Sequence, residues 1–176
     1  RNCKSRVDWN FRRGCHCCWF DQKDACHQSR LPSNGRNWKS DGIFDRKTKT
    51  NKIEAEKVVD LVFEHFKKYP NRSLGVVAFS ISQQSAIEDI IQERREQNDE
   101  FARFFDGNLE EPFFVKNLET VQGDERDTII FSVAYAKDSS GKFLHNFGPL
   151  NKKGGERRLN VAVTRAKYNV KLVSSI

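Results

Sequence analysis

The run Leu74-Gly-Val-Val-Ala-Phe79 decides the fold class, because it is continuously apolar yet only six residues long. A strand that is buried on both faces has this pattern. Helical patterns flank it: one begins at Asn51, which with Glu54 has the spacing of a capping box, and ends before Pro70, and another covers about residues 82–98. Strands that alternate with helices predict an α/β fold, a mostly parallel sheet with helices on both faces.

The same alternation continues to the end of the chain. Further elements are expected at 113–118 (strand), 128–134 (strand), 137–155 (long loop), 156–166 (helix) and 170–173 (strand). Ligands of open parallel sheets usually bind at the carboxyl ends of the strands. The segments that follow Leu118 and surround residues 156–166 are therefore the expected site elements.

Composition divides the chain near residue 40. The net charge is +7, but residues 1–52 carry 13 basic against 5 acidic side chains, and the remaining residues are close to neutral. All five Cys and all three Trp also fall within the first 38 residues. We therefore treat residues 1–40, a basic segment rich in Cys and Trp and expected to be irregular, separately from a domain over residues 41–176.

An acidic loop connects two of the expected strands. It belongs to the stretch Val115-Lys-Asn-Leu-Glu-Thr-Val-Gln-Gly-Asp-Glu-Arg-Asp127, in which Gly123 lets the backbone turn sharply or approach a ligand closely. Loops of this composition are common as solvated turns between strands. Taken alone, the stretch favours that reading over a binding site.

A second stretch, Gly154-Gly-Glu-Arg-Arg-Leu-Asn-Val-Ala-Val-Thr-Arg-Ala-Lys167, combines apolar helical positions with four cations. Leu159, Val161 and Ala162 could face the core, while Arg165 lies near the expected end of the helix. An Arg on a rigid element suits a planar, bidentate contact to phosphate. Taken alone, the stretch favours a solvated, Arg-rich helix face, or cations near a helix C-terminus, over a phosphate contact.

Together the two stretches resemble motifs V and VI of superfamily 1 helicases. Val121-Gln-Gly-Asp-Glu-Arg-Asp127 and Arg157-Arg-Leu-Asn-Val-Ala-Val-Thr-Arg-Ala-Lys167 match those motifs in order and spacing. The likeness is to the group of the nonsense-mediated-decay RNA helicase and the replication nuclease-helicases, and especially to large bacterial multidomain helicases with a Vsr-like nuclease. It covers about residues 41–176, and implies a second RecA-like motor domain, cut short at its end.

The resemblance implies roles for five residues at an ATP site shared with a first motor domain. Arg165 matches the arginine finger, which neutralises charge on the transferring phosphoryl group. Glu125 matches an acid that contacts the nucleotide at its ribose, and Gln122 and Gly123 shape the loop around it. Arg158 is expected near the same ATP site.

The resemblance also implies a nucleic-acid contact, because Thr120 matches a position near the nucleic-acid backbone, where a hydroxyl can donate to phosphate. The expected partner is single-stranded nucleic acid, with DNA favoured by the bacterial relatives. An N-terminal RecA-like domain of the same protein and a downstream nuclease domain are further expected partners.

The sequence contains no Gly-x-x-x-x-Gly-Lys-Ser/Thr phosphate loop and no acidic pair after an apolar strand. Both features belong to the first motor domain, which would hold most of the ATP and its Mg²⁺. The fold is therefore expected to be of the phosphate-loop NTPase type without the phosphate loop, and the chain alone is expected to be inactive as an ATPase.

The first forty residues lack the Tyr-Arg pair with which the family opens this domain. Cys15 and Cys18 have the spacing of zinc ligands, but the compact Cys-His-Cys-Cys run fits a repeated ligand pair poorly, so no metal site is assigned. Free cysteines in a cytoplasmic protein are the preferred reading. The basic charge could mark a nucleic-acid contact and the three Trp could stack on bases, but a poorly ordered basic tail is the preferred reading.

Two rival functions remain open at this stage. The domain could bind nucleic acid without ATP chemistry, or it could be a degenerate helicase fragment. Arg165 and Glu125 favour a helicase or translocase motor, because passive binding requires neither residue. No apolar run approaches the length of about 18 residues that a membrane span needs, so no membrane partner is expected.

Overall fold

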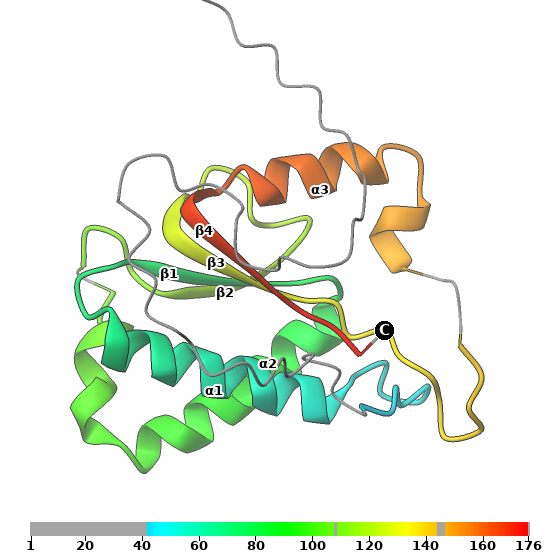
Figure 1. Cartoon of the computed structure of the whole chain (residues 1–176), viewed down its shortest axis with the longest axis horizontal. Helices are drawn as coiled ribbons and strands as arrows, with labels where there is room; N and C mark the ends of the chain where they lie inside the picture. The colour runs from blue at the N-terminus through cyan, green and yellow to red at the C-terminus, as the bar shows by residue number, and fades with distance from the viewer. Residues whose placement is uncertain (1–41, 108, 144–146, 176) are drawn as a thin grey trace, which may run out of the picture.

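A four-stranded parallel sheet forms the centre of the molecule in the computed structural model, which describes residues 42–107, 109–143 and 147–175 (Figure 1). The elements are α1 Lys52–Lys68, β1 Leu74–Ala78, α2 Ile81–Glu96, the 3₁₀ helix η1 Asp99–Phe105, β2 Phe114–Asn117, β3 Arg126–Ser132, the 3₁₀ helix η2 Gly148–Asn151, α3 Gly155–Val163 and β4 Ala166–Val173. The strand order is β2-β1-β3-β4, and every pair is parallel. Helices α1 and α2 cover one face and α3 lies over the other, which confirms the predicted fold class.

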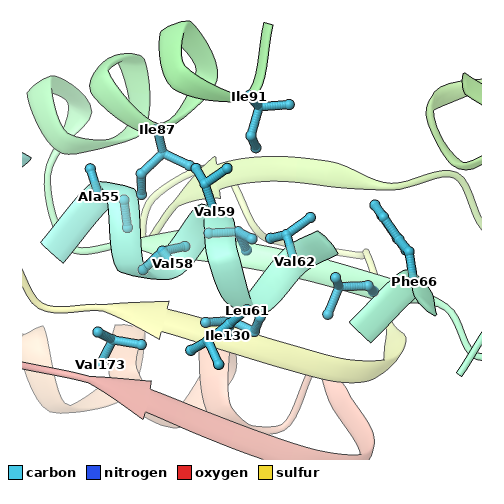
Figure 2. Close-up of a cluster of buried hydrophobic side chains, with 13 residues drawn as sticks. Ala55, Val58, Val59, Leu61, Val62, Phe66, Ile87, Ile91, Ile130 and Val173 are labelled. Atoms are coloured by element: carbon cyan, nitrogen blue, oxygen red, sulfur yellow. The ribbon is translucent and has the colours of Figure 1, made fainter. Parts of the chain in front are cut away.

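The face toward α1 and α2 is filled by aliphatic side chains and by Phe66, against which further Phe side chains pack (Figure 2). Val58, Val59 and Val62 of α1 are fully buried, at spacings that place them on one side of the helix. They pack with Ile130 of β3 and Val173 of β4. This burial against two strands orients α1 along the sheet.

The opposite face is covered by α3 and by the segment that links β2 to β3. This link spans residues 118–125 and contains no helix. Leu118 and Val121 are buried in the same cluster as Phe131 of β3 and Ala162 of α3. The link therefore lies flat on the sheet, and it returns the chain from the carboxyl end of β2 to the amino end of β3.

The largest differences from the predicted element ends lie between α3 and β4. Helix α3 stops at Val163 and β4 begins at Ala166, whereas a helix to 166 and a strand from 170 were expected. The start of β4 was missed because Lys167 and Asn169 interrupt the continuous apolar run that a buried strand would have. In the described part of the chain β4 is the last strand of the sheet, and its Tyr168, Val170 and Leu172 are exposed. No helix in the described part of the chain is long and apolar enough to span a membrane.

The capping box predicted at α1 forms only in part. The Asn51 side chain accepts a hydrogen bond from the Glu54 N–H at 3.1 Å, as expected for an N-cap. The reciprocal bond is absent, because the Asn51 N–H donates to Gln83 instead, at 2.9 Å. Glu54 is buried and accepts hydrogen bonds from the Ser132 hydroxyl and the Ala134 N–H, at 2.8 and 2.7 Å. Its carboxylate thus joins α1 to the carboxyl end of β3.

Replacing Glu54 with Ala should lower the free energy of unfolding by about 3 kcal/mol, because buried donors lose their acceptor at roughly 1–3 kcal/mol each. Glu56→Ala, at an exposed position of the same helix, is the matched control and should change stability by less than about 0.5 kcal/mol. Urea denaturation of both variants measures the difference. Equal effects in the two variants would contradict a structural role for the Glu54 carboxylate.

His65 should make stability depend on pH. Its side chain is buried, Nε2 lies 3.1 Å from the Arg72 carbonyl, and Nδ1 has no hydrogen-bond partner. Burial lowers the pKa of His65 from its usual value of 6.5, so the unfolded chain binds the proton more readily than the folded one. The free energy of unfolding should therefore fall as pH drops below 6.5, with a slope of at most about 1.4 kcal/mol per pH unit.

Urea unfolding at a series of pH values between about 7 and 5 checks this prediction. His65→Gln keeps an amide donor for the Arg72 carbonyl but cannot be protonated, and should show a shallower dependence on pH. The same slope in both proteins would assign the pH dependence to other groups.

Candidate nucleotide site

Arg165 and Glu125 lie 40 residues apart in sequence, and the structure brings them together. Glu125 immediately precedes β3 and Arg165 immediately precedes β4. These strands are parallel neighbours, and the Arg126 N–H donates to the Arg165 carbonyl at 3.0 Å. The Arg165 Nη1 is 3.4 Å from Glu125 Oε1, an ion pair at the outer limit of hydrogen-bond length.

The pair sits at the amino ends of β3 and β4, so the expectation of a site at the carboxyl ends was wrong for these two residues. One reason is that the link over residues 118–125 returns across the sheet before it reaches Glu125. The other is that α3 ends at Val163, which leaves Arg165 in the turn after the helix rather than within it.

Short local hydrogen bonds define the position of Arg165. Its Nε donates to the Val161 carbonyl at 3.1 Å, and its backbone N–H donates to the Ala162 carbonyl at 3.1 Å. A guanidinium has five N–H donors, and these contacts with Glu125 and Val161 use two of them. The side chain is 22% exposed, so a ligand anion can reach the remaining donors.

Gln122 and Gly123 form an exposed turn in the link that leads to Glu125. Gly123 has a φ of 85°, in the left-handed region, and a Cβ there would meet no atom within 4 Å. The glycine is therefore needed for the backbone conformation and not for close packing. Asp124 anchors the turn to β2 through an ion pair with Lys116 at 2.5 Å.

Thr120 lies at the other end of the link, beyond the carboxyl end of β2, and is exposed. Its hydroxyl accepts a hydrogen bond from the Asn117 N–H at 3.2 Å. The Asn117 side chain accepts bonds from the N–H groups of Glu119 and Thr120, at 2.9 and 3.2 Å. Sequence reasoning missed Asn117, although an Asn at a strand end followed by a polar turn is a usual turn signal.

Arg158 lies in the first part of α3, two turns before Arg165. A rise of about 1.5 Å per residue separates the two positions by roughly 10 Å along the helix. The role of Arg158 near the ATP site therefore stays a prediction.

Within the described ranges, no three His, Cys, Asp or Glu side chains are grouped so that they could hold a metal ion. The Cys15 and Cys18 considered for zinc lie outside those ranges, as does the rest of the segment over residues 1–40.

Comparisons with known proteins agree with the motifs. The model of a family described as an AAA domain matches residues 4–176. The chain is 41% identical over 139 residues to the uncharacterized ATP-dependent helicase MG140 of Mycoplasma genitalium, covering 75% of this chain and 12% of that protein. It is 30% identical over 128 residues to Helicase SEN1 of Saccharomyces cerevisiae, covering 69% of this chain and 5% of that protein.

A solved structure titled as the C-terminal domain of a possible DNA helicase from Lactobacillus plantarum is similar at a TM-score of 0.44 and 17% identity, over 71% of this chain and 68% of that one. The chain belongs to the AAA domain family. Within that family it is a C-terminal domain of the superfamily 1 helicase type. It spans about an eighth or less of the length of the curated relatives it matches.

Proposed function

We propose that this domain supplies half of a composite ATPase site in an ATP-dependent helicase or translocase, with Arg165 as the arginine finger. The observation that carries the proposal is the meeting of Arg165 and Glu125 at the amino ends of two adjacent strands. Both residues stand in the stretches that match motifs V and VI. Neither residue belongs to the hydrophobic core.

The geometry of the ion pair would allow Arg165 to leave Glu125 and contact a phosphoryl oxygen instead. At 3.4 Å and partly exposed, the contact between Arg165 and Glu125 is weak, and exposed pairs contribute about 0–1 kcal/mol. A phosphoryl oxygen could therefore take the place of the carboxylate at little cost. Glu125 would then be free to accept hydrogen bonds from ribose hydroxyls, with Gln122 and Gly123 shaping the turn beside it. Arg158 is proposed at the far side of the same cleft.

The other half of the site would come from a first motor domain of the same protein. A phosphate loop there would hold ATP and Mg²⁺, because the present sequence contains no Gly-x-x-x-x-Gly-Lys-Ser/Thr run. ATP hydrolysis supplies the free energy for movement along nucleic acid. On this proposal, the domain alone turns over ATP negligibly.

The proposed substrate is single-stranded nucleic acid, with DNA preferred, and Thr120 is the proposed backbone contact. Thr120 is exposed, and its backbone N–H and hydroxyl are oriented by Asn117. A hydroxyl held this way contacts phosphate without reading sequence. A nuclease domain further along the protein remains part of the proposal.

Arg165→Ala should reduce nucleic-acid-stimulated ATPase by about 10³-fold or more when the domain is joined to a phosphate-loop domain, because a finger contributes roughly 10³–10⁵ in rate. Nucleotide affinity should change little, since the phosphate loop supplies most of the binding. Steady-state kinetics and binding of a fluorescent ATP analogue measure the two effects.

Arg157→Ala is the matched control, because Arg157 is an exposed cation of α3 with no ion pair to another described residue. Near-normal turnover by Arg165→Ala would remove the finger assignment. Absence of ATPase activity in the unsubstituted, joined protein would favour a passive nucleic-acid-binding module. Salt-dependent binding to single strands would then detect such a module.

We also propose that the folded domain begins after residue 40. Gly42 packs against Asn51, and Phe44 belongs to the cluster under α3, so a cut before these residues keeps both contacts. A chain of residues 41–176 should therefore unfold in one cooperative thermal transition. Calorimetry checks this, and loss of the transition would place residues 1–40 within the folding unit.

A further inference from the structure

The residues that follow Glu125 and Arg165 both bind one short segment. Arg126 comes directly after Glu125, and Lys167 comes two positions after Arg165. Arg126 donates to the carbonyl oxygen of Pro112, and Lys167 forms an ion pair with the carboxylate of Glu111. The segment Glu111–Pro112, just before β2, thus contacts the chain beside both candidate nucleotide-site residues.

The contact from Arg126 is buried. Its side chain donates to the Pro112 carbonyl from Nε at 2.9 Å and from Nη2 at 2.6 Å. Its Nη1 donates to the backbone carbonyl of Glu125 at 2.6 Å. The guanidinium also lies 4.7 Å from the ring centre of Phe114, in the first position of β2. Arg126 therefore fixes the backbone of Glu125 relative to β2.

The partner of Lys167, Glu111, also connects β4 to the start of β1. Glu111 also accepts a hydrogen bond from the Ser73 hydroxyl, just before β1. The Ser73 N–H donates to Asp127 Oδ2 at 3.0 Å, and the Asp127 N–H donates to the Ser73 hydroxyl oxygen at 2.9 Å. Hydrogen bonding to Lys167 lowers the pKa of Glu111, and the same bond raises the pKa of Lys167, so both groups are charged near neutral pH.

These bonds connect the amino ends of all four strands. Ser73 precedes β1, the Glu111–Pro112 segment precedes β2, Asp127 is in β3 and Lys167 is in β4. The core clusters hold the middle of the sheet, whereas this polar network holds the edge at which Arg165 and Glu125 project.

We propose that the Glu111–Pro112 segment is a positioning element that fixes Arg165 relative to Glu125. The inference rests on the proposed function, because the position of Arg165 affects turnover only if Arg165 acts in it. Two residues, 164 and 165, separate α3 from β4, so holding Lys167 restrains the turn directly. Reacting groups require such support because a displacement of about 1 Å can reduce the rate roughly 10²-fold.

Glu111→Gln tests the positioning role, since it removes the charge that holds Lys167 while keeping the size of the side chain. Glu110→Gln is the matched control, at the adjacent, exposed position. In the full 176-residue chain, the ¹H–¹⁵N signal of Arg165 Nε reports its bond to the Val161 carbonyl, and Arg165→Lys identifies that signal. Glu111→Gln should shift or broaden the signal, and Glu110→Gln should leave it unchanged.

In the form joined to a phosphate-loop domain, Glu111→Gln should lower kcat roughly 10-fold and leave the KM for ATP within about 2-fold, because ATP binding does not depend on the finger. Lys167→Gln should match it, and the double variant should be no slower than either single variant, since both break one interaction. If Glu111→Gln does not fold, Lys167→Gln tests the same interaction.

An Arg165 signal and a kcat that are the same in Glu111→Gln and Glu110→Gln would overturn the positioning role. If Glu111→Gln shifts the Arg165 signal but leaves kcat unchanged, the positioning role is also overturned. The polar network would then have a purely structural role. An inactive unsubstituted protein would refute the proposed function instead, and the Arg165 signal would then decide the geometric inference by itself.

Discussion

Parallel pairing of β3 with β4 is the constraint on which the candidate site depends. Neighbouring parallel strands begin at the same edge of a sheet, so the residues that precede them must lie side by side. Glu125 and Arg165 occupy those positions, and the Arg126 N–H to Arg165 carbonyl bond fixes their register. Two residues that are 40 positions apart in sequence are thus brought into contact in space.

Much of the fold follows from patterns of apolar residues. The run at β1 and the helical spacing in α1 predicted elements that the structure contains within a few residues of the expected bounds. The prediction was less accurate at β4, because an edge strand carries polar and exposed residues that resemble a loop. The Glu54 bonds to β3 were also unpredictable, since local spacing indicated a capping box, and a partner about 80 residues away left no local signal.

The sequence selected candidate residues for the site but did not predict where they lie in the sheet. Motif matching selected Arg165 and Glu125 from a sequence rich in both residue types, while the general rule for parallel sheets placed them at the wrong ends of the strands. Glu111 had no sequence signal, because acidic residues before a Pro are ordinary in loops. Its importance appears only when the ends of β1, β2, β3 and β4 are seen together, joined by Ser73, Asp127 and Lys167.

The strand order has a further consequence for how the domain behaves in solution. In the described part of the molecule, β4 is the last strand of the sheet, and Tyr168, Val170 and Leu172 on it are exposed. An outer strand with free backbone groups and β-branched or aromatic side chains is a template for pairing with another chain. The exposed side chains of β4 are thus the positions at which a charged residue would oppose pairing of the isolated domain with a second copy.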